Sequence, residues 1–251
     1  MKYGIVIFDL DDTLVDTESV YHRAQEAMLT IFKKHCRSID FRKAFKTLRE
    51  IDHELVLLHN GDHAYGYWKL AEALWLHFQA RQSVKDATKT ASKMRKRDVQ
   101  PFFVLEAAEA HDSIIRNIVP ELLDDAMRVV KHLKRKYVLV LLSEGDRTVK
   151  IPVIRYHRFD RLFDEIVLPQ RKNKVAFLRA KRKGERVLFG QEHVKRYRLV
   201  FVGARISQDI MPGQKIGAET IWIKGPYFPG TTREARPDHS LAGLTQLLRI
   251  L

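Results

Sequence analysis

The sequence has almost no cysteine and no long apolar run. Cys36 is the only cysteine among 251 residues, so an internal disulfide is excluded. The longest apolar runs, such as residues 137–142, fall far short of the roughly 20 residues that a membrane-spanning helix needs. The opening residues, MKYGIVIFDLDD, run into acidic residues after a short apolar stretch, and no small-residue cleavage site of a signal peptide follows. These absences predict a cytoplasmic protein that does not span a membrane. The 45% hydrophobic content excludes a disordered chain.

The chain also has fewer acidic residues than basic residues. The chain has 45 basic and 31 acidic residues, and its net charge is +14. Such a charge attracts phosphorylated metabolites, nucleic acid or an acidic membrane surface, although an ion-pair-rich surface of a heat-adapted protein has the same composition. A nucleic-acid surface requires the basic clusters to lie on one face, and otherwise they are solvated helix faces. The clusters are residues 131–136, 155–161, 179–186 and 195–198.

Several apolar, β-branched segments alternate with helical patterns. Fully apolar runs of this length are typical of strands that are buried on both faces of a parallel sheet. Strands that alternate with helices predict an α/β fold with a doubly wound parallel sheet, a Rossmann-like core. The expected strands are residues 3–8, 137–142, 165–168, 199–202 and 220–223.

The interval from about residue 18 to residue 119 contains no strand pattern. Its apolar residues recur at helical spacing, as Leu70, Leu74 and Phe78 do. About a hundred helical residues are too many for one crossover between strands. We therefore predict an α/β core of residues 1–16 and 120–251, with an inserted all-α module of residues 17–119. Its clearest turn, residues 59–68, is interpreted either as a substrate-contacting loop or as a helix connection.

An acidic cluster follows the first strand, where the sequence reads FDLDDTL. Asp9, Asp11 and Asp12 lie within four positions and Thr13 follows them. Ligands of open α/β sheets bind at the carboxyl ends of the strands. Carboxylates this close repel one another, and a divalent cation with a preference for oxygen ligands, such as Mg²⁺, offsets that repulsion. The alternative is a helix N-terminus whose free amides are capped by these side chains.

An apolar strand that ends in D-x-D-x-T and precedes an inserted helical cap resembles the phosphatases of the haloacid dehalogenase-like superfamily. The resemblance implies that Asp9 is the nucleophile and forms an aspartyl-phosphate. It implies that Asp11 is the general acid and base. It further implies that Mg²⁺ is held by the carboxylate of Asp9, by the backbone carbonyl of Asp11 and by acids further along the chain.

Two further motifs of the superfamily have counterparts here. The apolar run YVLVLL ends in Ser143, whose hydroxyl is expected to bind phosphate together with the amides of Glu144 and Gly145. The sequence RKNKVAF offers a lysine that would offset the charge of the nucleophile and the phosphoryl group. The superfamily's spacing between this lysine and the aromatic residue of the following helix favours Lys172, because Phe177 then matches the aromatic residue. Lys174 is the alternative.

The fourth motif departs from the superfamily pattern V-G-D-x-x-x-x-D. The sequence reads VGARISQDI, so Ala204 stands at the first acid, which is a metal ligand in the superfamily, and Asp209 matches the second. Loss of one carboxylate lowers the affinity for a hard cation. Asp209 then approaches the metal directly, or water fills the place and leaves a slower enzyme, or the protein is a degenerate member.

These motifs predict a Mg²⁺-dependent phosphate monoester hydrolase that acts on a small phosphorylated metabolite, with Asp9, Asp11 and Asp209 around the metal. One alternative is a non-catalytic protein that binds a phosphorylated ligand. Another is a metal-independent, dehalogenase-like hydrolase. The dehalogenases lack the second acid, whereas this chain has Asp11. A nucleic-acid-binding module is the third alternative.

Overall fold

The structure is a computed structural model, and it describes residues 2–36, 40–59, 65–99, 101–123, 125–191, 196–225 and 235–251. The chain forms two compact units, residues 1–18 with 119–251, and residues 19–118. The boundaries expected from the sequence, after residues 16 and 119, lie within two residues of these.

The first unit is built on a parallel sheet with strand order β3-β2-β1-β4-β5-β6. Its central strand, β1, pairs with β2 on one side and β4 on the other, so Ile5 lies between Val138 and Leu199. All five residues of β1 are buried, which explains the continuous apolar run. The strands are β1 (Gly4–Phe8), β2 (Tyr137–Leu142), β3 (Glu165–Val167), β4 (Arg198–Gly203), β5 (Glu219–Ile223) and β6 (His239–Leu241).

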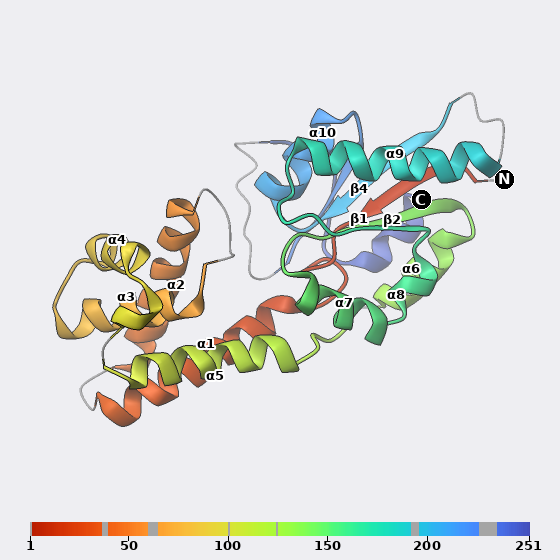
Figure 1. The fold of residues 1–251 in the computed structure, drawn as a ribbon. Coiled ribbons are helices and arrows are strands. Elements are labelled where there is room, and N and C mark those ends of the chain that lie inside the picture. Colours follow the sequence, from red (N-terminus) through yellow and green to blue (C-terminus); the bar gives the residue numbers. More distant parts are fainter. Residues whose placement is uncertain are drawn as a thin grey trace. The chain divides into compact units, whose positions relative to one another are not determined.

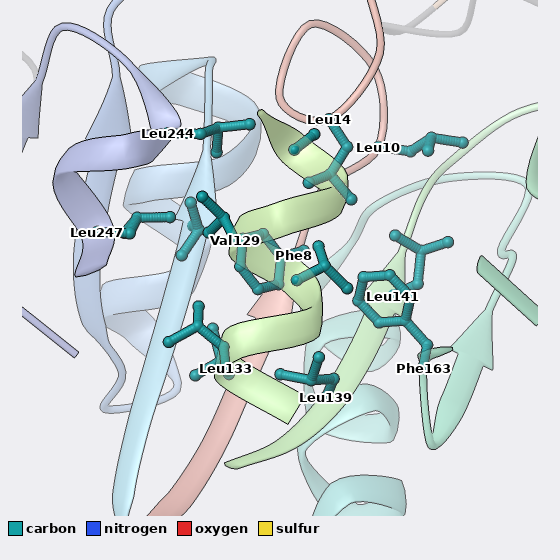
Figure 2. Packing of buried hydrophobic residues seen from close by; sticks show 14 of the residues in the cluster. Phe8, Leu10, Leu14, Val129, Leu133, Leu139, Leu141, Phe163, Leu244 and Leu247 are labelled. Carbon is teal, nitrogen blue, oxygen red and sulfur yellow. The ribbon is translucent and has the colours of Figure 1, made fainter. Parts of the chain in front are cut away.

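Helices cover both faces of this sheet (Figure 1). Alternate residues of β1 point to opposite faces, so Phe8 packs with α6 and η3 whereas Ile7 packs with α9. Figure 2 shows the first of these clusters, in which Val129 and Leu133 of α6 lie beside Phe8. The helical segments are α6 (Ala126–Lys134), α7 (Arg147–Tyr156), α8 (Phe159–Leu162), α9 (Lys174–Gln191), the π-helical turn η2 (Ile206–Ile210), α10 (Met211–Lys215) and the 3-10 helix η3 (Leu244–Arg249).

The second unit has a hydrophobic core of its own. Leu48, Leu74 and Val104 come from three of its helices and are fully buried together. Side chains cap two helix starts, because Asp40 accepts from the amide of Lys43 and Ser83 accepts from that of Asp86. The helical segments are α1 (Thr17–His35), α2 (Phe41–Leu58), α3 (Tyr67–Gln79), α4 (Val84–Lys93), the short η1 (Lys96–Asp98) and α5 (Phe103–Asn117), α1 beginning two residues before the unit.

The predicted α/β class with a Rossmann-like sheet is confirmed, and the five expected strands are present within a residue or two. Strand β6 was not expected from the sequence, because its three residues are too few and too polar to form an apolar run. The predicted turn at residues 59–68 ends earlier than expected, since Tyr67 and Trp68 belong to α3, and residues 60–64 lie outside the described residues. No helix among the described residues has both the length and the apolarity to cross a membrane.

Candidate active site

A tight turn after β1 presents acidic side chains at the carboxyl end of the sheet. The amide of Asp9 still donates to Val202 of β4, and the chain then turns so that the amide of Leu14 donates to the carbonyl of Leu10 over 2.8 Å. Asp12 has a φ of 57°, a left-handed conformation that aspartate adopts more readily than most residues. The sequence FDLDDTL therefore places an aspartate at the one position of this turn that has a positive φ.

One lysine joins two buried carboxylates in this site. The ammonium of Lys172 donates to Oδ1 of Asp9 over 2.5 Å and to Oδ1 of Asp209 over 2.6 Å. The three side chains are almost inaccessible to solvent, with exposed fractions of 7%, 3% and 0%. Thr13 donates its hydroxyl to the second oxygen of Asp9 over 3.2 Å. Residues from three places in the chain thus meet around Asp9: the turn after β1, Lys172 and Asp209.

Burial and the charges around Asp9 shift the pKa of its carboxyl group. Burial and the neighbouring carboxylate of Asp209 raise the pKa of Asp9 to about 7, although Lys172 lowers it. Burial alone would lower the pKa of Lys172, but the carboxylates of Asp209 and Asp9 raise it. Lys172 therefore stays charged, and the charge of Asp9 depends on its neighbours.

Asp11 is held by a different set of donors. Lys150 donates to its two oxygens over 2.6 and 2.7 Å, Thr17 donates over 2.8 Å, and Ser143 donates over 3.1 Å. Burial would raise the pKa of Asp11, but the ammonium of Lys150 more than offsets it and lowers the pKa to about 2. Without substrate, Asp11 is a carboxylate at neutral pH.

The segment after β2 lies beside these acids. Ser143 is fully buried and its hydroxyl reaches Asp11. The side chain of Glu144 accepts from the backbone amide of Lys172 over 2.6 Å. The amide of Gly145, expected to bind phosphate, donates to the carbonyl of Pro169 over 3.3 Å. Lys174, the alternative to Lys172, is exposed at the start of α9.

The turn after β4 positions Asp209. A Cβ on Gly203 would lie 2.4 Å from that of Asp209, so only glycine leaves room for the carboxylate. The amide of Arg205 donates to Oδ2 of Asp209 over 2.9 Å. Ala204 is buried and contributes its carbonyl, which accepts from the indole of Trp222. The place of the superfamily's first acid thus contains only a methyl group.

Lys150 and Arg205 were not identified from the sequence. The guanidinium of Arg205 lies 3.3 Å from Oδ2 of Asp12. Burial would lower the pKa of Arg205, but Asp12 and the three other aspartates raise it. The available signal was weak: Lys150 lies in the first turn of the helix after Ser143, and Arg205 follows Ala204. In a chain with 45 basic residues, these positions do not stand out.

The side chains present do not fit the magnesium site that the resemblance implies. Lys172, Thr13 and the amide of Arg205 already donate to all four carboxylate oxygens of Asp9 and Asp209. Mg²⁺ requires near-octahedral oxygen coordination, and Ala204 offers no side-chain oxygen. Within the described ranges, no three histidine, cysteine or acidic side chains gather closely enough to hold a metal ion.

Solved structures with this fold come from several bacteria. A HAD-hydrolase of Bacillus subtilis, described as bound to magnesium, has a TM-score of 0.62 and 15% identity, and the match covers 100% of this chain and 99% of that one. A 2-haloacid dehalogenase of Pseudomonas syringae has a TM-score of 0.55 and 20% identity, and the match covers 100% and 98%. At these identities the likeness shows the fold alone.

Sequence comparison gives the family. The glyceraldehyde 3-phosphate phosphatase of Pyrococcus furiosus is 21% identical over 253 aligned positions, which cover 100% of this chain and 93% of that protein. The model of the haloacid dehalogenase-like hydrolases matches residues 3–217, which span both units and every motif described above. The chain belongs to the haloacid dehalogenase-like hydrolase family, and it is a hydrolase.

Proposed function

We propose that this hydrolase cleaves phosphate monoesters through a phosphorylated Asp9. The observation that carries the proposal is the buried ammonium of Lys172 between the carboxylates of Asp9 and Asp209. A carboxylate at the carboxyl end of the central strand is a suitable nucleophile, and the adjacent cation offsets the charge of an incoming phosphoryl group. The phosphatase activity named for the Pyrococcus furiosus relative supports this substrate class.

In the first step, an oxygen of Asp9 attacks the phosphorus and the bond to the ester oxygen breaks. Asp11 donates a proton to that oxygen, so an alcohol leaves. The ammonium of Lys150 favours the ionised form of Asp11, whereas the negative charge of a bound phosphate favours its protonated form. Substrate binding therefore promotes the protonation that this step requires.

In the second step, water attacks the phosphorus of the aspartyl-phosphate and gives a proton to Asp11. The bond between phosphorus and Asp9 breaks, which releases inorganic phosphate and restores both carboxyl groups. Ser143 and Lys172 hold the phosphoryl oxygens in both steps, with the amide of Glu144 as a further donor. Both steps use only side chains and amides of this chain, because the side chains of the site do not fit a metal.

The test compares wild type with Asp9→Asn on p-nitrophenyl phosphate and on a panel of phosphorylated metabolites. We expect the variant to lose at least about 1,000-fold in kcat/KM, because the amide is a poor nucleophile of similar size. Asp160→Asn, at an exposed site in α8, is the control and should match wild type. Mass spectrometry of acid-quenched wild type should find one phosphoryl group on the peptide that contains Asp9. Equal turnover of wild type and Asp9→Asn would overturn the mechanism.

Ala204 favours a second candidate function. A member that has lost the first acid of this motif could bind a phosphorylated ligand without turning it over. In that case wild type shows no turnover on any ester of the panel, with or without Mg²⁺. Saturable binding of inorganic phosphate would accompany this result.

A further inference from the structure

The proposed mechanism uses Lys150 only through its charge, and it does not use Arg205. Lys150 contacts both oxygens of Asp11, and its side chain is only 12% exposed. It extends from the first turn of α7, which begins directly after the Ser143 segment. A Cβ on Gly145 would lie 3.3 Å from Cε of Lys150, so the turn between β2 and α7 leaves just enough room for this side chain.

Arg205 occupies the other side of the acidic cluster. Its guanidinium reaches Asp12 over 3.3 Å and Gln208 over 3.2 Å, while its backbone amide binds Asp209. Arg205 follows directly after Ala204, the residue that replaces an acid. The alanine that stands at the place of the acid and this cation therefore lie in the same turn.

The balance of charge explains what the two cations do together. Among the described residues of this cluster, four aspartate carboxylates meet the cations Lys150, Lys172 and Arg205, which leaves one negative charge when all four aspartates are ionised. With Lys172 alone, three negative charges would remain. Lys150 and Arg205 together bring the two positive charges that one divalent cation brings.

We propose that Lys150 and Arg205 replace the divalent cation of this active site with fixed side-chain charges, so that the enzyme works without a metal. The proposal rests on the proposed function, since it concerns the same nucleophile. The supporting geometry is that the two cations contact Asp11 and Asp12, that donors occupy the oxygens of Asp9 and Asp209, and that Ala204 offers no ligand. The three cations also leave at most one negative charge in the cluster to attract a divalent ion.

Binding of Mn²⁺ as a probe, followed by electron paramagnetic resonance, tests the proposal without reference to turnover. Wild type should bind Mn²⁺ with a Kd weaker than about 1 mM. The double variant Lys150→Gln with Ala204→Asp restores a ligand and removes a repelling charge, so it should bind at least about 10-fold more tightly. Arg147→Gln removes an exposed charge from the same turn of α7, and it should bind as wild type does.

Activity provides the second arm. If phosphate esters are turned over, a metal chelator should leave the wild-type rate within about 2-fold. Wild-type binding tighter than 1 mM, a chelator-induced loss that Mg²⁺ restores, or a folded double variant that binds no better than wild type would each overturn the proposal. Where the double variant does not fold, the wild-type Kd decides. Absence of all turnover would count against the proposed function, while the Mn²⁺ measurement would still decide the charge replacement.

Discussion

At the scale of single residues, the site depends on one lysine that serves two carboxylates. Lys172 lies 163 residues from Asp9 in sequence, yet its ammonium is within 2.5 Å of that carboxylate. Buried charges are tolerated only where partners of opposite charge surround them. The sequence could propose Lys172 because an aromatic residue, Phe177, follows at the family spacing. It could not show that Asp209 shares the same ammonium.

Removal of this lysine should destabilise the protein strongly. Lys172→Ala leaves the buried carboxylates of Asp9 and Asp209 without their shared cation. We expect the free energy of unfolding to fall by about 3 kcal/mol, as for other broken buried ion pairs. Urea unfolding followed by circular dichroism measures the change.

Lys174→Ala is the matched control, because Lys174 is exposed two residues further on. Its unfolding free energy should lie within about 0.5 kcal/mol of wild type. Equal stability of the two variants would show that the buried lysine contributes no more than a surface charge does.

At the scale of elements, α9 shows how closely a helix must approach the sheet. A Cβ on Gly184 would lie 2.8 Å from Cγ2 of Ile5 and 3.1 Å from Cγ2 of Val140. The helix thus rests on β1 and β2 at a position without a side chain. This contact fixes the helix whose first residues follow Lys172. The sequence pattern predicts the helix, but it does not reveal why residue 184 is glycine.

Two glycine substitutions in α9 should have opposite effects. Gly184→Ala should lower the free energy of unfolding by about 1 kcal/mol, because overpacking outweighs the better helix propensity of alanine. Gly190→Ala, where nothing lies within 4 Å of the new Cβ, should raise it by about 0.5 kcal/mol. Thermal and urea unfolding give both values. A stabilising Gly184→Ala would mean that the sheet yields to the methyl group at no cost.

At the scale of the whole molecule, the basic charge includes two clusters on opposite sides of the sheet. Residues 131–134 of the first cluster lie in α6 and residues 179–186 lie in α9, and these two helices cover opposite faces of the sheet (Figure 1). These two clusters therefore do not form one nucleic-acid surface. Lys195, at the start of the fourth cluster, lies outside the described residues.

Stability as a function of pH should reflect two buried groups of the helical unit. Burial lowers the pKa of His111 from 6.5 to about 4, and burial raises the pKa of Glu72 from 4.5 to about 7. His111 therefore contributes stability above pH 6.5 that is lost as the pH falls towards 4, about 3 kcal/mol in all. Glu72 contributes stability below pH 4.5 that is lost as the pH rises through 7.

Variants separate the two contributions. The stability of His111→Gln relative to wild type should rise as the pH falls from 7 to 4. That of Glu72→Gln relative to wild type should rise as the pH rises from 4.5 to 7. Urea unfolding at each pH provides the measurement, and each variant controls for the other because the slopes have opposite signs. If the free energy of unfolding of each variant relative to wild type does not change with pH, neither group changes its ionisation on folding.

The sequence by itself determined the architecture and the acids at its centre. Buried parallel strands must be apolar throughout, so the apolar runs at residues 4–8 and 137–142 predicted two of the strands. The acidic sequence FDLDDTL could be recognised because it begins where the first of these runs ends. Only the tertiary structure decided which cations meet those acids. Lys150 lies 139 residues from Asp11 and Arg205 lies 193 residues from Asp12. Ion pairs over such separations depend on strand order and helix placement, and neither leaves a local pattern in a chain so rich in basic residues.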